Sequence, residues 1–297
     1  MAAVSLREKI YQITKEYLDQ HNGILLGECV SDPGGVAGTI PQSPNVVDLP
    51  MTEVAGADFA VGCALVGRRP IFVVRFQDFM LMNGSPFIAY AATVKDIHGM
   101  AAPVFIRALA NDHFDATHSN VLHSMFMHNP GFRVCAPMTP GEYQEVWDTF
   151  WQDDKCMYVS EFRDAYDNTE DMHDQVYEDA VLNVFGVSQC RANMIKASEM
   201  LLEEGIRINL FHVLWLKPFD TSKYAPYIAK QSRGLIVDPT RVNCGAGQSL
   251  AYQLMMDYPG SHFEALGCAD EIKTTNPASY NEIPTADDIV RKIKAML

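Results

Sequence analysis

The amino-acid sequence predicts an α/β fold of two domains, each a mostly parallel sheet flanked by helices. Short apolar runs alternate with helical patterns along the chain, and this alternation is typical of parallel sheets covered on both faces by helices. A polar, acidic stretch, DAYDNTEDMHDQVYE (164–178), interrupts the alternation near the middle. We therefore expect domains at residues 1–168 and 179–297, joined by a linker at 169–178.

The first domain is expected to begin with an amphipathic helix at 4–21. GILLGECV (23–30) follows as a short buried strand, and DPGGVAG (32–38) as a glycine-rich turn. Further apolar runs predict strands at 46–49, 71–76, 104–109, 132–136 and 157–161. Helical patterns separate these strands at 53–66, 86–98, 119–128 and 140–152.

The second domain repeats the alternation after the acidic stretch. Strands are expected at 181–187, 208–215, 234–238 and 263–266. Helices are expected at 188–204, 221–230, 247–256 and 285–296. The order of these elements predicts a second parallel sheet with its own helices.

Composition narrows the class of protein. The 297 residues are 48% hydrophobic and 20% charged, as in a soluble globular protein. A net charge of −14 argues against a nucleic-acid or anionic-membrane partner. The seven cysteines are scattered and contain no C-x-x-C pair, which favours reduced thiols. No signal peptide, transit peptide or membrane-length apolar run is evident, so we expect a cytoplasmic protein.

The helix expected at 53–66 is almost wholly apolar. Only Asp58 interrupts it after the first residue, so we expect the helix to be buried on most sides. Glu53 stands where the turn after strand 46–49 becomes this helix. An acidic residue in a first turn complements the helix dipole, and position alone favours that interpretation. A carboxylate beside a buried strand is also where an enzyme can keep a group with a shifted pKa.

A resemblance favours the catalytic interpretation. The segment VVDLPMTEVAGADFAVGCALVGRRPI (46–71) resembles the V-I-D-T-P-I-x-E segment of the β subunits of thiamine-diphosphate-dependent 2-oxo acid dehydrogenase E1, and transketolases carry a related version. INLFHVLWLKPFD (208–220) and PTADDIVRKIKAML (284–297) are similar to segments of the same family. The resemblance implies a transketolase-like pyrimidine-binding domain followed by a transketolase C-terminal-like domain.

The resemblance also implies roles for particular residues. In the family, the glutamate at the position of Glu53 bonds N1′ of the cofactor's aminopyrimidine, and a carboxylic acid there favours the imino tautomer that accepts the thiazolium C2 proton. Phe79, in FQDF, falls where the pattern F-A-D-[YF] has an aromatic that stacks on the aminopyrimidine, although a core role for Phe79 stays open. Glu28 matches the acidic position of G-E-D-V, which belongs to a polar channel between paired active sites.

DATHSNVLHSMFMHNPGFRV (115–134) resembles the pattern H-S-Q-x-x-x-x-x-F-x-H-x-P-G-x-K-V. The resemblance places His118 at the active site, where a histidine can donate to an oxyanion or move a proton. ALANDHFDAT (108–117) stands where the β subunits carry a glycine-rich loop, and its end looks closer to G-P-T-H of transketolase. Asp112 and His113 are candidates for a different substrate pocket.

The sequence gives little support for a metal site. Four histidines recur every five residues from His113 to His128, but five residues turn a helix by about 500°, so they share no helical face. His128 is interpreted as a structural histidine. The family's G-D-G motif for Mg²⁺ and diphosphate has no counterpart, since the chain contains no Asp-Gly pair. We therefore expect another polypeptide to hold both, and the resemblance implies an α-type partner subunit in an α2β2 heterotetramer.

These observations predict the β-type subunit of a two-subunit thiamine-diphosphate enzyme that cleaves the bond next to a 2-oxo acid or ketose carbonyl. A 2-oxo acid dehydrogenase E1 β subunit is the nearest resemblance. One alternative is the C-terminal half of a split transketolase, which moves a two-carbon unit between sugars. Another is a non-catalytic scaffold subunit of the same fold.

Overall fold

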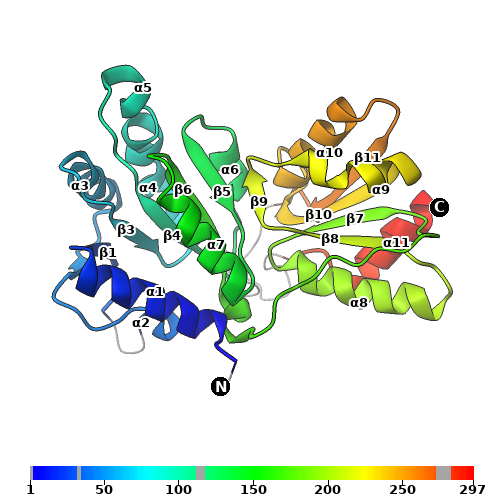
Figure 1. The fold of residues 1–297 in the computed structure, drawn as a ribbon, viewed down its shortest axis with the longest axis horizontal. Coiled ribbons are helices and arrows are strands. Elements are labelled where there is room, and N and C mark those ends of the chain that lie inside the picture. Colours follow the sequence, from blue (N-terminus) through cyan, green and yellow to red (C-terminus); the bar gives the residue numbers. More distant parts are fainter. Residues whose placement is uncertain (1–2, 32–34, 112–117, 272–281) are drawn as a thin grey trace. The chain divides into compact units, whose positions relative to one another are not determined.

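A computed structural model describes residues 3–31, 35–111, 118–271 and 282–297 (Figure 1). Of the described residues, those up to Asp171 form one compact unit and those from Met172 onward form a second. Each unit contains a parallel sheet with helices packed on it. The predicted α/β class with two mostly parallel sheets is confirmed. In the described part of the chain, no helix is long and apolar enough to cross a membrane.

The first unit contains strands β1 to β6 and helices α1 to α7. The strands are β1 (Leu25–Glu28), β2 (Val46–Leu49), β3 (Ile71–Val74), β4 (Phe105–Ala110), β5 (Phe132–Cys135) and β6 (Cys156–Phe162). The helices are α1 (Leu6–Gln20), α2 (Gly35–Gly38), α3 (Glu53–Leu65), α4 (Met80–Pro86), α5 (Val94–His98), α6 (His123–Met127) and α7 (Pro140–Phe150). Three shorter helical turns are η1 (Gln77–Phe79), η2 (Phe87–Ala91) and η3 (Arg163–Asp167).

The strands of this unit lie in the order β2-β1-β3-β4-β6-β5. Neighbouring strands are parallel, with Glu28 opposite Leu49 and Gly27 opposite Val73. The strands β3 and β4 are buried along their whole length, which explains their continuous apolar runs in the sequence. Because the strands are parallel, the loops that follow β2, β1, β3 and β4 leave from one edge of the sheet.

The second unit contains strands β7 to β11 and helices α8 to α11. The strands are β7 (Asn183–Val187), β8 (Asn209–Val213), β9 (Trp215–Lys217), β10 (Arg233–Arg241) and β11 (His262–Cys268). The helical segments are α8 (Cys190–Glu203), η4 (Thr221–Tyr224), α9 (Ala225–Lys230), α10 (Ala246–Asp257) and α11 (Ala286–Met296). A parallel sheet has the order β11-β10-β7-β8.

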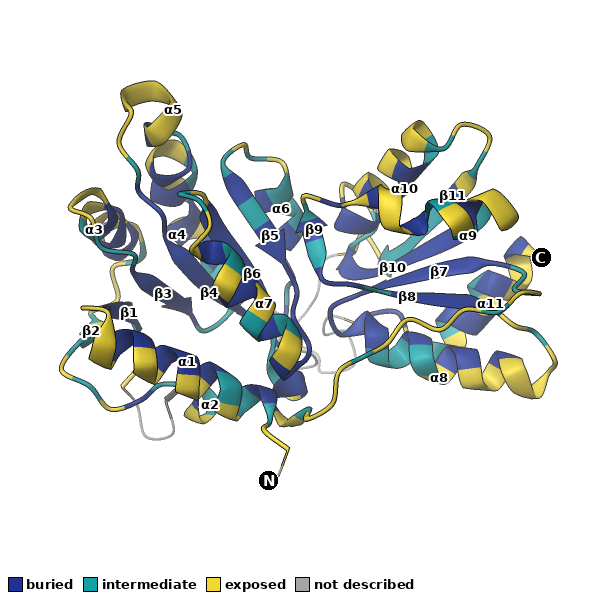
Figure 2. Cartoon of the chain, viewed as in Figure 1, coloured by how far each residue is buried: buried dark blue, intermediate teal, exposed yellow. Residues whose placement is uncertain are grey.

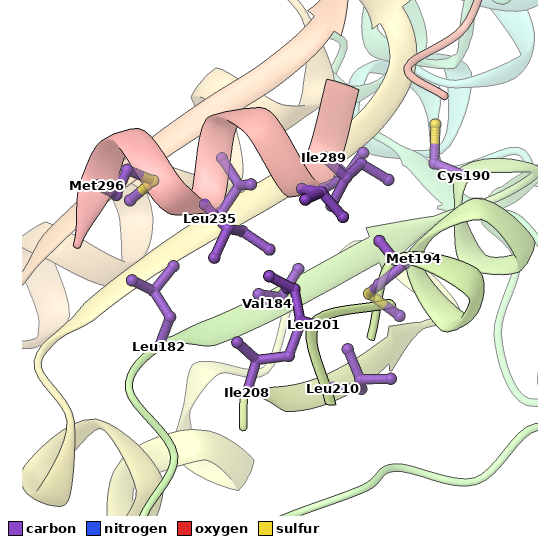
Figure 3. Packing of buried hydrophobic residues seen from close by; sticks show 14 of the residues in the cluster. Leu182, Val184, Cys190, Met194, Leu201, Ile208, Leu210, Leu235, Ile289 and Met296 are labelled. Carbon is purple, nitrogen blue, oxygen red and sulfur yellow. The ribbon is translucent and has the colours of Figure 1, made fainter. Parts of the chain in front are cut away.

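The core of the second unit lies between its sheet and two helices. Val184 of β7, Leu210 of β8 and Leu235 of β10 belong to one cluster with Leu201 of α8 and Ile289 of α11 (Figure 3). All five side chains are fully buried. Apolar side chains at helical spacing in α8 and α11 therefore close this face of the sheet, as the sequence pattern indicates.

Three helical segments differ from the sequence predictions. The pattern at 86–98 is broken into the end of α4, the π-helical turn η2 and the short α5. Helix 119–128 is reduced to α6, because side chains of the neighbouring η1 bind the backbone of Asn120 and Leu122. The third difference is α3, whose apolar side chains are only partly covered: Val54, Phe59 and Leu65 are exposed, so the expectation of burial on most sides is wrong for the chain alone (Figure 2).

Candidate functional site

Four of the residues selected from the sequence follow the carboxyl ends of neighbouring strands. Glu28 is the last residue of β1, and Glu53 is the first residue of α3, after β2. Phe79 ends η1, after β3, and His118 follows β4 in the chain. Because β2, β1, β3 and β4 are adjacent and parallel, these residues gather at one edge of the sheet. Ligand sites of open parallel sheets lie at this edge.

The structure brings Glu28 and Glu53 together. Glu28 Oε1 accepts a hydrogen bond of 2.9 Å from the backbone N–H of Thr52, the residue before Glu53. Burial raises the pKa of Glu28, and the negative charge of Glu53 raises it further against the opposing effect of the Thr52 hydrogen bond. Both carboxyl groups are half-buried. Glu28 therefore keeps its proton to a higher pH than an ordinary glutamate does.

Phe79 and His118 also meet. The imidazole of His118 lies with its centroid 5.5 Å from the ring of Phe79 and 4.4 Å from the ring of Phe76. Both contacts are near perpendicular, at 70° and 72°, which is a favourable geometry for aromatic pairs. His118 is thus held between the ring of Phe76, which precedes η1, and the ring of Phe79, the last residue of η1.

Asp78 lies beside this aromatic group and was not selected from the sequence. Its carboxylate accepts from the backbone N–H of Asn120 at 3.2 Å and from the Asn120 side-chain amide. Burial raises the pKa of Asp78, while the Asn120 hydrogen bonds and the nearby His118 oppose the increase. The sequence signal that could have identified Asp78 is its position between Gln77 and Phe79 in FQDF. All three of these side chains are oriented by η1.

The remaining candidates divide into described and undescribed residues. Asp112 and His113 lie outside the residues that the structure describes. His123 is fully buried, and its Nδ1 lies 3.1 Å from Ser160 Oγ, whereas His128 is exposed. The interpretation of His128 as a structural histidine is therefore wrong, and His123 has that environment instead. Within the described ranges, no group of three or more His, Cys, Asp or Glu could hold a metal ion.

The chain matches two known families along most of its length. Residues 13–168 match the family "Transketolase, pyrimidine binding domain", and residues 175–289 match "Transketolase, C-terminal domain". A solved structure described as "Split gene transketolase, inactive beta4 tetramer" superimposes with a TM-score of 0.78 at 15% identity. The superposition covers 99% of this chain and 98% of the other, and it shows the shared fold.

Three relatives are similar in sequence. The β subunit of acetoin:2,6-dichlorophenolindophenol oxidoreductase from Cupriavidus necator is 26% identical over 74% of this chain and 71% of its own length. The β subunit of 2-oxoisovalerate dehydrogenase from Bacillus subtilis is 25% identical over 80% of each chain. The β subunit of the pyruvate dehydrogenase E1 component from Rickettsia felis is 23% identical over 98% of this chain and 97% of its own.

Proposed function

The chain belongs to the family of transketolase pyrimidine-binding domains followed by transketolase C-terminal domains, and from this premise we propose that it is the β-type subunit of a two-subunit thiamine-diphosphate enzyme. The proposed enzyme cleaves the bond next to the carbonyl of a 2-oxo acid and passes on the acyl unit, as an E1 β subunit does. The relatives named for 2-oxoisovalerate and pyruvate support the 2-oxo acid class. The relative named for acetoin, a hydroxyketone, supports only the wider class of compounds with a carbonyl at the bond to be cleaved.

The observation that carries the proposal is the carboxyl pair at the start of α3. Glu28 Oε1 accepts from the backbone N–H of Thr52, the residue before Glu53, and burial together with the charge of Glu53 raises the pKa of Glu28. Thiamine diphosphate, when bound, supplies an acidic carbon that attacks carbonyl groups. Glu53 would hold the aminopyrimidine by a hydrogen bond at N1′, with Glu28 as the neighbouring proton store. The donor set of this edge therefore fits the pyrimidine half of the cofactor.

Phe79 and His118 complete the proposed site. The ring of Phe79 would pack on the aminopyrimidine and exclude water from the Glu53 hydrogen bond. The imidazole of His118, held by Phe76 and Phe79, would donate a hydrogen bond to the substrate oxygen as negative charge develops on it. The carboxyl group of Asp78 lies near His118, and the charge interaction with His118 lowers the pKa of Asp78.

A partner subunit is the second part of the proposal. In the first unit, many of the exposed large apolar side chains lie between residues 51 and 100, in and around α3, α4, η2 and α5. They are Met51, Val54, Phe59, Leu65, Val66, Leu81, Met82, Tyr90, Ile97 and Met100. We name these residues the apolar surface. Exposed apolar area of this kind marks a protein interface, and we assign it to an α-type subunit that holds Mg²⁺ and the diphosphate in an α2β2 assembly.

Replacing Glu53→Gln tests the catalytic role. The amide keeps the size of the side chain but cannot carry the proton, so we expect turnover by the partner-complete enzyme to fall about 10²- to 10⁴-fold. Assembly with the partner should be unchanged in size-exclusion chromatography. Glu16→Gln, which changes an exposed carboxylate on α1, is the matched control and should retain full turnover. Unchanged turnover in Glu53→Gln would refute the catalytic role and favour a scaffold subunit.

A split transketolase is the second candidate. The fold likeness to the split gene transketolase structure and the glycine-free segment 108–117 favour it. The two candidates differ in their substrates: an E1 enzyme transfers an acyl group to lipoamide, whereas a transketolase consumes a ketose donor. Consumption of ketose donors by the complex, without acyl transfer to lipoamide, would establish the second candidate.

A further inference from the structure

Gln77 is a buried amide at the centre of the first unit whose side chain makes four hydrogen bonds. Its Nε2 donates to the backbone carbonyl of Ala108 at 3.1 Å and to Ser160 Oγ at 2.7 Å. Its Oε1 accepts from the backbone N–H of Leu122 at 2.7 Å and from the hydroxyl of Tyr158 at 3.1 Å. The side chain is fully buried. Two donors and two acceptor positions are all that this amide has, so its hydrogen-bonding capacity is filled.

Two of these bonds join the ends of one segment of chain. Ala108 lies in β4, before His118, and Leu122 lies after it, immediately before α6. The backbone N–H of Leu122 is an obligate donor and the carbonyl of Ala108 an obligate acceptor, so the orientation of the amide is set by its partners. A single side chain from η1 therefore holds both ends of the segment that contains His118.

A second tether acts beside the first. Asp78, the next residue of η1, accepts two hydrogen bonds from Asn120. Asp78 thus binds Asn120, two positions after His118, and Gln77 binds Leu122, four positions after it. Phe76 and Phe79, on either side of this pair, contact the imidazole itself. Together, the four consecutive residues of FQDF contact one short stretch of chain, from His118 to Leu122.

We propose that Gln77 is a positioning residue, which fixes His118 between Phe76 and Phe79 by holding Ala108 and Leu122 at a set distance. Gln77 does not face the substrate and acts only through His118. The chemical consequence rests on the proposed function, because it requires His118 to act at the substrate oxygen. The structural consequence, a fixed imidazole, is independent of that function.

Side chains close to glutamine in size cannot make the same hydrogen bonds. A glutamate would place an acceptor against the carbonyl of Ala108 and a charge in a fully buried position. A methionine would fill the volume but leave the N–H of Leu122 and the carbonyl of Ala108 without this partner. Alanine is the residue of the F-A-D-[YF] pattern at this position, so Gln77→Ala introduces a residue that related chains accommodate there.

The direct test measures the His118 imidazole in the purified chain. Carbon–proton NMR spectra of histidine-labelled protein contain nine imidazole signals, and loss of one in His118→Asn assigns it. The rings of Phe76 and Phe79 should displace this signal from that of the exposed His128. In Gln77→Ala and in the volume-preserving Gln77→Met, we expect it to broaden or move toward the His128 position.

The control is a buried amide that does not touch this segment. Asn183 in the second unit donates to the carbonyl of Gln231 at 2.6 Å and accepts from Asn209 at 2.8 Å. Asn183→Ala should lower the unfolding midpoint without moving the His118 signal. If the His118 signal is unchanged in both Gln77 variants, the positioning role is refuted. Should both Gln77 variants fail to fold, Gln77→Asn keeps the amide but is one methylene too short to bind Ala108 and Leu122 together. It is expected to shift the same signal, and an unchanged signal there refutes the proposal.

The kinetic test uses the partner-complete enzyme. A displaced catalytic group lowers turnover by about 10- to 100-fold, so we expect kcat to fall by that factor in Gln77→Met. By contrast, the KM for thiamine diphosphate should change by less than about threefold, which is about the limit at which binding is judged unaffected. The reason is that Glu53 does not depend on Gln77. One outcome is that the His118 signal shifts in the Gln77 variants but the unmodified enzyme has no thiamine-diphosphate-dependent turnover. That outcome would refute the proposed function alone. Turnover that depends on Glu53, with kcat unaffected by Gln77→Met, would refute the positioning role alone.

Discussion

Glu161 is a single carboxylate that accepts four hydrogen bonds in fully buried surroundings. Arg107 donates from Nε at 2.7 Å and from Nη2 at 2.9 Å, while the hydroxyls of Tyr143 and Tyr166 donate at 2.9 and 2.6 Å. Burial opposes the charge of Arg107, but Glu161 outweighs it and raises the pKa of the guanidinium. Burial and the charge of Glu161 also raise the pKa of both phenols. The network ties β4, β6, α7 and η3 together.

Glu161→Gln should destabilise the first unit strongly. The substitution leaves the guanidinium of Arg107 buried without its counter-charge, and breaking a buried pair costs about 3–5 kcal/mol. Urea unfolding at neutral pH measures this loss. The matched control is Asp167→Asn, which breaks the exposed Arg7–Asp167 pair and should cost less than about 1 kcal/mol. Equal losses in the two variants would show that Arg107 finds another partner.

At the residue scale, the sequence indicates the carboxylates and rings of the proposed site but not what holds them. Glu53, Phe79 and His118 are candidates because the short patterns around them resemble those of the family. The partners of Gln77 lie 31 to 83 positions away, and Arg107 lies 54 positions from Glu161. Local patterns contain no information about such pairings, so only the folded chain shows them.

At the scale of the element, α3 shows why an apolar helix need not be buried in its own chain. Its buried residues are small, and Gly56 allows close approach to Leu49 of β2. Its larger side chains, Val54, Phe59 and Leu65, are exposed. The periodicity of the sequence cannot distinguish burial within a chain from burial against a partner, because both require apolar side chains.

A charge on α3 should disrupt assembly. Phe59 is 51% exposed near the centre of the helix, so Phe59→Asp leaves the fold intact but places a carboxylate in the proposed interface. We expect at least about thirtyfold weaker binding of the α-type partner, as at an aromatic interface residue. Titration by isothermal calorimetry measures the change. Leu202→Asp on α8, 46% exposed, is the control, and equal weakening by both would refute the assignment of the apolar surface.

At the scale of the molecule, both sheets follow from the alternation of strands and helices in the sequence. The second unit agrees best, because its core helices α8 and α11 bury apolar side chains at regular spacing within the chain itself. The first unit deviates at 86–98 and 119–128, where side-chain hydrogen bonds and a π-helical turn replace regular helix. Sequence patterns therefore predict the layers better than the segments around the proposed site, whose conformation is determined by long-range contacts.

The stability of the whole chain should depend on the protonation of His212 in β8. Burial, and after it the neighbouring charges of Arg191 and His173, lower its pKa to about 4. Arg191 Nε donates to His212 Nδ1 at 3.1 Å, which requires a neutral imidazole. The backbone N–H of His212 donates to Asp174 at 2.7 Å, so a carboxylate also lies near this residue. The native chain therefore favours the unprotonated side chain.

Because an unfolded histidine titrates near pH 6.5, the unfolded chain binds one more proton than the native chain between about pH 4 and 6.5. The contribution of His212 to the free energy of unfolding is therefore complete above pH 6.5 and decreases as the pH falls toward 4, by up to about 3 kcal/mol. His212→Gln should reduce the pH dependence of urea unfolding in this window, because the remaining slope then comes from other groups. His262→Gln, which changes an exposed histidine in β11, should leave the slope as it is. If His212→Gln does not reduce the slope of the unfolding free energy against pH, His212 takes up its proton at the same pH in the unfolded and native states. The Arg191–His212 contact would then not control acid stability.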